Sequence, residues 1–416
     1  MYVKTLHFFL PLLALLTSSS VPFSYGQNQE NPLAISTLGP VSRLSHGSSH
    51  WKPSQIFNVD DFGAKGDGTD DRKAFNKTWN QACSSKGGVF LVPNRTYLLG
   101  PMNFTGPCKF SLLTLKIVGT IEASTEQSEY REDLWHWLVF VSVKNLRVEG
   151  GGTFDGKGKV WWKNSCSVIN SLAVTFYDCK NLNVTNLRFK DGQRFHLFFD
   201  ACVNVKAENI LVTAPSNSPN TDGIHMRSTQ HIHVMNSIIK TGDDCISIIN
   251  GSTNVRATDI TCGPGHGISI GSLGPNNTES KVYNVTVDTV TMLGTSNGVR
   301  IKSWQGGSGY GENIIFQNIA MYNVTNPIII DQYYCDQKDP CPEQYSAVRI
   351  SNVFYNNITG SSFSKVAVKI NCSKTFECQG ISMRDVNLVR EGDGVVEASC
   401  NNVGLIKKGL VFPSCS

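Results

Sequence analysis

The chain has 416 residues, of which 40% are hydrophobic and 17% are charged, and its formal net charge at pH 7 is +4. These proportions exclude a disordered chain. The net charge is small and lysine and arginine form no block, so the sequence does not indicate nucleic-acid binding. A slightly positive net charge suits an anionic substrate. The 37 glycines and the many Val, Ile, Thr and Asn residues favour a β-rich fold.

Residues 1–26 have the layout of a secretory signal peptide, with one lysine, an apolar stretch and an end in small or polar residues. Residues 27–55 are polar and turn-rich, which predicts a flexible leader or propeptide. We expect the folded catalytic domain to span residues 56–416. No later apolar run reaches the roughly 18 residues that span a bilayer, so the sequence predicts a secreted, extracellular protein with no membrane partner.

Two further features predict the same compartment. The 13 cysteines favour disulfides in an oxidising setting. Ten N-x-S/T sequons predict a glycoprotein, with about half of them occupied, and they begin at Asn76, Asn94, Asn103, Asn183, Asn250, Asn276, Asn284, Asn323, Asn357 and Asn371.

One segment near the start of the predicted domain has a helical period. The run from Asp70 to Cys83 places apolar or small side chains on one face, namely Ala74, Phe75, Thr78, Trp79 and Ala82. Almost no later stretch shows a long amphipathic period. The sequence therefore predicts a short helix that caps the N-terminal end of a β-rich body.

An internal repeat follows the helix. The pattern Asn-apolar-x-apolar-x-x-apolar starts at Asn145, Asn181, Asn204, Asn254, Asn284 and Asn313, with His231 in the Asn position of one unit, and successive starts are 36, 23, 27, 23, 30 and 29 residues apart. Each unit holds two or three short strands joined by turns, which predicts one coil of a parallel β-helix. The alternative is a β-sandwich or a propeller.

Four polar segments recur at similar places after successive repeat starts, and they contain Asp222, Asp243-Asp244, His266 and Arg300-Ile301-Lys302. Stacked coils would set these residues side by side, about 4.8 Å apart from coil to coil. Neighbouring carboxylates push their pKa values apart, which gives one acid and one base. Glycoside hydrolysis needs this pair, with the carboxyls about 6.5–9.5 Å apart for inversion. Arg300 and Lys302 suit a substrate carboxylate.

The motifs resemble those of the polygalacturonases of glycoside hydrolase family 28, and most closely the plant branch. The resemblance runs from about Phe57 to Cys415 and rests on SPNTDGIH from Ser218, TGDDCISI from Thr241, CGPGHGISIGS from Cys262 and NGVRIKSWQGG from Asn297. It implies an all-β, single-stranded right-handed parallel β-helix, or solenoid. It also implies hydrolysis of α-1,4-linked galacturonan in pectin with inversion, without a cofactor or metal, by a monomer.

The resemblance also implies a role for each matching residue. Asp243 is expected to be the general acid, with Asp222 and Asp244 binding and activating water. His266 is expected to help set the protonation of the acid. Substrate binding is expected from Arg300, Lys302, Tyr334 and Asn220, although Asn220 is better placed to orient its turn.

Several alternatives stay open from the sequence. Cleavage is expected to be endo, with exo-polygalacturonase and rhamnogalacturonan or xylogalacturonan hydrolase as alternatives. Pectate lyase shares the fold but uses calcium and β-elimination, and a non-catalytic pectin-binding wall protein would have no need for the intact aspartates. Four other histidines have no partner motif and are expected to be structural or exposed, and these are His196, His225, His231 and His233.

The remaining carboxylates and the cysteines have structural interpretations. Asp60-Asp61, the run from Gly66 to Asp71 and Asp155 are expected to shape turns and helix caps. The expected cysteine pairs are Cys83–Cys108, Cys179–Cys202, Cys245–Cys262, Cys335–Cys341, Cys372–Cys378 and Cys400–Cys415. Compared with the plant relatives that it resembles, the chain has a shortened segment around Cys166, which makes Cys166 the candidate free thiol.

Overall fold

The computed structural model describes residues 55–131, 135–163, 172–337, 341–392 and 394–415. The predicted signal peptide, all of the predicted leader except Gln55, and the candidate free thiol Cys166 lie outside these residues. None of the described helices is long and apolar enough to cross a membrane.

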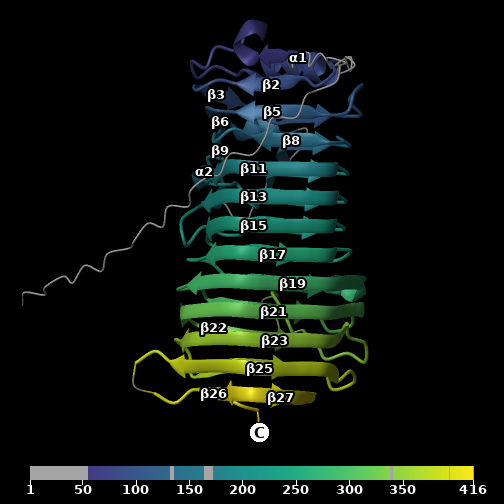
Figure 1. The fold of residues 1–416 in the computed structure, drawn as a ribbon, viewed down its shortest axis with the longest axis vertical. Helices are drawn as coiled ribbons and strands as arrows, with labels where there is room; N and C mark the ends of the chain where they lie inside the picture. The colour runs from purple at the N-terminus through teal and green to yellow at the C-terminus, as the bar shows by residue number, and fades with distance from the viewer. Residues whose placement is uncertain (1–54, 132–134, 164–171, 338–340, 393, 416) are drawn as a thin grey trace, which may run out of the picture. The chain divides into compact units, whose positions relative to one another are not determined.

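Two long sheets account for most of the described residues (Figure 1). The first sheet has 16 strands. Its main path is β1 Ile56–Asn58, β2 Val89–Val92, β5 Leu113–Ile117, β8 Leu146–Glu149, β11 Lys180–Lys190, β13 Val203–Thr213, β15 Gln230–Lys240, β17 Thr253–Cys262, β19 Glu279–Leu293, β21 Ser308–Val324, β23 Arg349–Ser362, β25 Cys378–Arg390 and β27 Val403–Phe412. Beside this path lie β3 Thr96–Leu99, β6 Thr120–Ala123 and β9 Thr153–Asp155.

The second sheet has 11 strands. They are β4 Met102–Thr105, β7 His136–Val141, β10 Leu172–Tyr177, β12 Leu197–Asp200, β14 Ile224–Arg227, β16 Ile246–Ile248, β18 Ile268–Leu273, β20 Asn297–Ser303, β22 Asn326–Asp331, β24 Val366–Asn371 and β26 Glu397–Asn401. The helical elements are η1 Val59–Phe62, α1 Arg72–Cys83, η2 Gln127–Tyr130, α2 Lys159–Trp162 and η3 Pro275–Asn277.

Every pairing between these strands is parallel, and each strand pairs with its counterpart in the next coil; Ile246 of β16, for example, pairs with Ile268 of β18. Strands joined by tight hairpins would pair antiparallel instead. The parallel β-helix is thereby confirmed, and the sandwich and propeller alternatives are wrong. The Asp70–Cys83 prediction is also confirmed, because α1 buries Ala74, Phe75, Thr78, Trp79 and Ala82.

The repeat starts are turn residues that stack from coil to coil. All of them, including His231, have left-handed backbone conformations with φ between 55° and 58°, which Asn adopts more readily than most residues. Their side chains form a ladder, in which Asn181 Nδ2 donates to Asn145 Oδ1 at 2.9 Å and Asn204 Nδ2 donates to Asn181 Oδ1 at 3.0 Å. The repeated Asn therefore marks a corner of each coil.

Aromatic side chains stack inside the coils near the N-terminal end. Phe104 stacks on Phe140 with ring centroids 4.6 Å apart, Phe140 on Phe176 at 4.8 Å and Phe176 on Phe199 at 5.6 Å. Trp79 of α1 lies edge-on against Phe104 at 5.1 Å. The helix thus closes the end of a column that the following coils continue.

Five of the six expected cysteine pairs are disulfides in the structure, and these are Cys83–Cys108, Cys245–Cys262, Cys335–Cys341, Cys372–Cys378 and Cys400–Cys415. The expectation for Cys179 and Cys202 is wrong, since both are buried free thiols. Each sulfur lies by a carbonyl oxygen of the preceding coil, with Cys179 Sγ at 3.4 Å from Phe140 O and Cys202 Sγ at 3.2 Å from Phe176 O.

In the next coil a hydroxyl takes the place of these thiols. Thr229 Oγ1 donates a hydrogen bond to the carbonyl oxygen of Phe199 at 3.1 Å. A hydrogen bond between the two thiols lowers the pKa of Cys179 and raises the pKa of Cys202. These cysteines therefore act as small buried hydrogen-bonding residues rather than as a cross-link.

Candidate active site

An open cleft of about 1000 Å³ runs along the outer face of the second sheet. Strand register explains its lining: Val139, Thr175, Phe198, His225 and Ser247 occupy paired positions on successive strands and all face it. The same column continues through Ser269 to Arg300. Side chains one position away on each strand point into the core, as the alternation of a β-strand requires.

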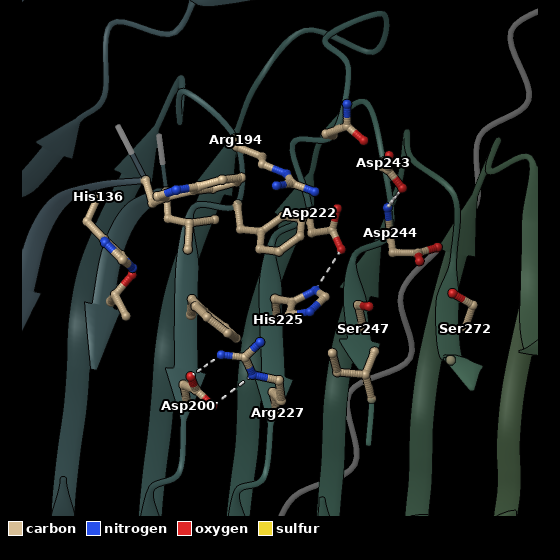
Figure 2. A pocket seen from close by; sticks show the side chains of 18 of the residues that line it. His136, Arg194, Asp200, Asp222, His225, Arg227, Asp243, Asp244, Ser247 and Ser272 are labelled. Carbon is tan, nitrogen blue, oxygen red and sulfur yellow. Dashed lines mark hydrogen bonds and ion pairs between the residues drawn. The ribbon is translucent and has the colours of Figure 1, made fainter. Parts of the chain in front are cut away.

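The predicted acidic residues lie in the turns that enter these strands. Ile224, Ile246 and Ile268 are register partners, and the residues two positions before them are Asp222, Asp244 and His266. Asp243 precedes Asp244. The structure therefore brings the four predicted motifs to one side of the molecule, where Asp222, Asp243, Asp244, His266, Arg300 and Lys302 all line the cleft. Figure 2 shows the three aspartates of this group.

Asp243 forms a pair with His266. His266 Nδ1 lies 3.0 Å from Asp243 Oδ1, and the backbone N–H of His266 donates to the carbonyl of Asp243. The hydrogen bond with Asp243 raises the pKa of His266. Burial alone would raise the pKa of Asp243, but the hydrogen bond and charge of His266 lower it. The pair therefore holds one proton to a higher pH than a free carboxyl would.

Asp244 is the most completely bound carboxylate of the three. Its Oδ1 accepts hydrogen bonds from Ser269 Oγ at 2.7 Å and from an Arg300 guanidinium nitrogen at 2.9 Å, and its Oδ2 accepts one from Lys302 Nζ at 3.1 Å. All of these groups are buried or nearly so. Arg300 and Lys302 thus both pair with Asp244 inside the cleft.

Asp222 is buried beside a histidine that the sequence did not single out. Burial, together with the charges of Asp243 and Asp244, raises the pKa of Asp222 well above its usual range. Asp222 Oδ2 lies 3.0 Å from His225 Nδ1, and burial lowers the pKa of His225 to about 3. A protonated Asp222 can therefore donate to the neutral imidazole of His225.

His225, expected to be structural or exposed, is buried, contacts Asp222 and lines the cleft. The sequence carries a signal for it, since His225 stands three residues after Asp222 at a position that faces the cleft once strand register is known. His196 fits its structural prediction, because it is buried with Nδ1 at 3.1 Å from the carbonyl oxygen of Asp222.

The remaining predicted substrate-binding residues also line the cleft. Asn220 is an exposed turn residue with φ 54°. The Tyr334 ring has Lys302 Nζ at 5.3 Å from its centroid and Trp304 edge-on at 5.9 Å. The other carboxylates are structural, as expected: Asp71 accepts from the backbone N–H groups of Lys65 and Gly66, and Asp155 pairs with Lys190 at 3.0 Å.

Asp243, Asp244 and His266 are the one group of described residues that could offer a metal ion ligand atoms close together, all within 4.8 Å of one another. Their present partners do not fit that use. Both oxygens of Asp244 already face Arg300 or Lys302, and these fixed positive charges would repel a cation. The donor set suits proton transfer better than metal binding.

Beyond Asp222, the cleft wall is aromatic and cationic. Phe195 stacks on His225 with centroids 4.0 Å apart and an interplanar angle of 11°, and the guanidinium of Arg194 lies over Phe195 at 4.7 Å. One step further down the strands, Arg227 makes two hydrogen bonds to the carboxylate of Asp200 (Figure 2). The cleft therefore continues on both sides of the acidic residues.

Comparison with known proteins agrees with this site. The model of the glycosyl hydrolases family 28 matches residues 83–411. A polygalacturonase of Persea americana is 56% identical over 91% of this chain and 83% of its own length, and polygalacturonase QRT2 of Arabidopsis thaliana is 51% identical over 100% of both chains.

Among solved structures, a polygalacturonase from Erwinia carotovora ssp. carotovora is 25% identical, with a TM-score of 0.70 over 87% of this chain and 99% of its own. An endo-xylogalacturonan hydrolase from Aspergillus tubingensis is 19% identical, with a TM-score of 0.73 over 84% and 96% of the two chains, and shows the fold alone. With its coils stacked and its acids gathered in one cleft, the chain belongs to the glycosyl hydrolases of family 28.

Proposed function

We propose that this glycoside hydrolase is a polygalacturonase that cuts the α-1,4 bonds of de-esterified homogalacturonan in pectin, inside the polymer and with inversion. The carrying observation is the acidic cluster, in which Asp243 lies 3.0 Å from His266 Nδ1 while Asp244 is held by two cations. The names of the plant relatives, at 51% and 56% identity, support the substrate.

In the proposed reaction, Asp243 gives the proton of the Asp243–His266 pair to the glycosidic oxygen as the bond from that oxygen to the anomeric carbon breaks. A water molecule held by Asp222 and Asp244 attacks the opposite face of the anomeric carbon, and its proton passes to the carboxylate of Asp244. Burial raises the pKa of Asp222, so Asp222 is proposed to position the water while Asp244 accepts the proton and then releases it to solvent. Solvent then returns a proton to the Asp243–His266 pair.

Arg300, Lys302 and Tyr334 are proposed to bind the galacturonate on the reducing-end side of the cut. Arg300 and Lys302 use only part of their donors on Asp244 and Ser269, and a guanidinium has five N–H groups. Donors that can reach a substrate carboxylate therefore remain. Asn220 is proposed to shape the turn that carries Asp222.

Internal cleavage is supported by the extent of the cleft. Its lining runs from Asn103 and Val139 at one end, past the three aspartates, to Tyr334 and Asp336 at the other. A site closed on one side would favour removal of terminal sugars. The intact aspartates argue against a protein that only binds pectin, and the cations on Asp244 argue against the calcium site of a lyase.

The test is hydrolysis of polygalacturonate by the wild type and by Asp243→Asn. We expect the wild type to give a broad, shifting range of oligomers with saturated ends, and the variant to keep its fold by circular dichroism but to release almost no reducing ends. Single-sugar products from the outset would contradict internal cleavage. Unsaturated products would contradict hydrolysis, and undiminished activity of the variant would remove Asp243 as the acid.

Extracellular action agrees with the plant relatives. We further propose secretion through removal of residues 1–26, with residues 27–55 as a leader and residues 56–416 as a catalytic domain that works as a monomer in the cell wall. N-terminal sequencing of the protein recovered from the medium of expressing plant cells tests the first cleavage, and a mature protein that begins before Gln27 would contradict it.

A further inference from the structure

Arg194 occupies the same place in its coil as the proposed acid does two coils later. Leu197, Ile224 and Ile246 are register partners on β12, β14 and β16, and Arg194 and Asp243 each stand three residues before their partner. Arg300 and Lys302 lie on β20, on the opposite side of the acids. Cationic side chains thus flank the acidic cluster on both sides along the cleft.

Arg194 differs from the other cationic residues of the cleft in its partners. Arg227 is paired with Asp200, and Arg300 and Lys302 are paired with Asp244. For Arg194, in the part of the chain that the structure describes, there is no ion pair, and its buried Nε has no hydrogen-bond partner. Burial lowers the pKa of Arg194, while the charges of Asp222 and Asp243 act in the opposite direction.

The position of Arg194 is fixed by aromatic contacts. Its guanidinium lies over the Phe195 ring, and that ring stacks on His225, which contacts Asp222. Figure 2 shows the Arg194 side chain projecting over the cleft in the direction of Asp222. A planar, pre-oriented guanidinium loses little entropy on binding and matches a carboxylate with two parallel hydrogen bonds.

We propose that Arg194 binds the carboxylate of the galacturonate on the non-reducing side of the scissile bond, opposite the sugar held by Arg300 and Lys302. The proposal rests on the proposed function, because it needs the cut to fall at the Asp222–Asp243–Asp244 cluster. It adds a specificity residue. Two neighbouring galacturonates then bind best with free carboxylates, since a methyl ester carries no charge for Arg194 to pair with.

The test compares Arg194→Gln and Arg194→Lys with the wild type on polygalacturonate and on highly methyl-esterified homogalacturonan. A hydrogen bond to a charged group contributes enough binding that its loss should raise KM on polygalacturonate about tenfold to a hundredfold, with kcat changed much less. On the esterified polymer the same substitution should change KM less than threefold. The lysine variant, which keeps the charge, should recover part of the loss.

Arg256→Gln is the matched control, because Arg256 is an exposed arginine on β17 of the other sheet, outside the cleft. Its KM should equal that of the wild type. The proposal is overturned if Arg194→Gln leaves KM on polygalacturonate unchanged. It is also overturned if the loss is equal on both polymers, or if only the pH profile moves, which would mean that Arg194 acts on the acids instead of the substrate.

Failure of the proposed function would look different. Calorimetric binding of a galacturonate oligomer to Asp243→Asn and to Asp243→Asn/Arg194→Gln measures the Arg194 contact without turnover, and weaker binding by the double variant supports the proposal. Equal binding by the two variants contradicts the contact while leaving the assignment of Asp243 intact. Hydrolysis by Asp243→Asn contradicts that assignment, whatever the two affinities are.

Discussion

His266 holds Asp243 from two directions, with its ring nitrogen 3.0 Å from the carboxylate and its backbone N–H on the carbonyl of the same residue. The imidazole cannot move independently of the acid. Because the pKa of His266 is raised by this contact and the pKa of Asp243 is lowered, the proton of the pair is lost only as the pH rises through the raised pKa of His266.

The alkaline limb of the pH–activity profile therefore belongs to this pair. In His266→Asn the imidazole that carries the raised pKa is absent. The Asp243 carboxyl must then hold the catalytic proton by itself, and a carboxyl loses its proton at a lower pH than this imidazole does. We expect the alkaline limb of kcat/KM to move to lower pH, measured by reducing-end release across the pH range. His233→Asn, on β15 in the other sheet, is the control and should keep the wild-type profile; an unmoved limb in His266→Asn would contradict the shared proton.

Lys302 should be needed for activity because it fixes Asp244. Lys302→Gln removes a buried charged hydrogen bond, and we expect kcat/KM to fall about tenfold to a hundredfold. Lys281→Gln is the matched control, since its ion pair with Glu279 is largely exposed and such pairs contribute little. Steady-state kinetics on polygalacturonate measure both, and equal activity of the two variants would show that the Asp244 contact is dispensable.

Acid should weaken the fold through the buried histidines. Burial lowers the pKa of His196 to about 4 from its ordinary 6.5, so between these values the unfolded chain binds the proton and the folded chain does not. Stability is then complete above pH 6.5 and is lost as the pH falls toward 4, by about 3 kcal/mol for this residue.

Urea unfolding at neutral pH and near pH 4.5 measures this loss. His196→Gln should show a smaller difference between the two conditions than the wild type, whatever its absolute stability. His231→Gln, whose side chain is exposed, should show the wild-type difference. An undiminished difference in His196→Gln would mean that other groups carry the acid sensitivity.

Cys179 and Cys202 should remain thiols in the purified protein. Unfolding without a reductant, followed by alkylation and peptide mass spectrometry, should find both modified and the Cys245 and Cys262 peptides still joined. Cys202→Ser should cost less than about 1 kcal/mol, because the neighbouring coil already uses a hydroxyl at this place. Removing both Cys245 and Cys262 should cost about 3 kcal/mol. Recovery of a joined Cys179–Cys202 peptide would contradict the structure.

Sequence patterns predicted the features that depend on local chemistry. Asn at the corner of each coil and the helical face of Arg72–Cys83 follow from turn preference and periodicity. The acids could be placed together because one coil separates them. Arg194 was not found in this way, and His225, although it stands three residues after Asp222, could be placed in the cleft only once the strand register was known.

The cysteines show a second limit. Cys179 and Cys202 have the spacing of stacked neighbours, and spacing alone suggests a bond between them. Their sulfurs lie instead by carbonyl oxygens of successive coils, an orientation that only the packed interior determines. Proximity was predictable here, whereas direction was not.

The column of Ile224, Ile246, Ile268 and Val299 has a consequence for how such proteins diverge. These interior residues hold the coils in register, while the residues two positions before the three isoleucines lie in turns and carry the reactive side chains. The backbone bonds of the turns do not depend on which side chain stands there, so side chains of the cleft can change while the stack persists. Descendants of one ancestral scaffold could acquire preferences for differently decorated polysaccharides while the architecture stays constant.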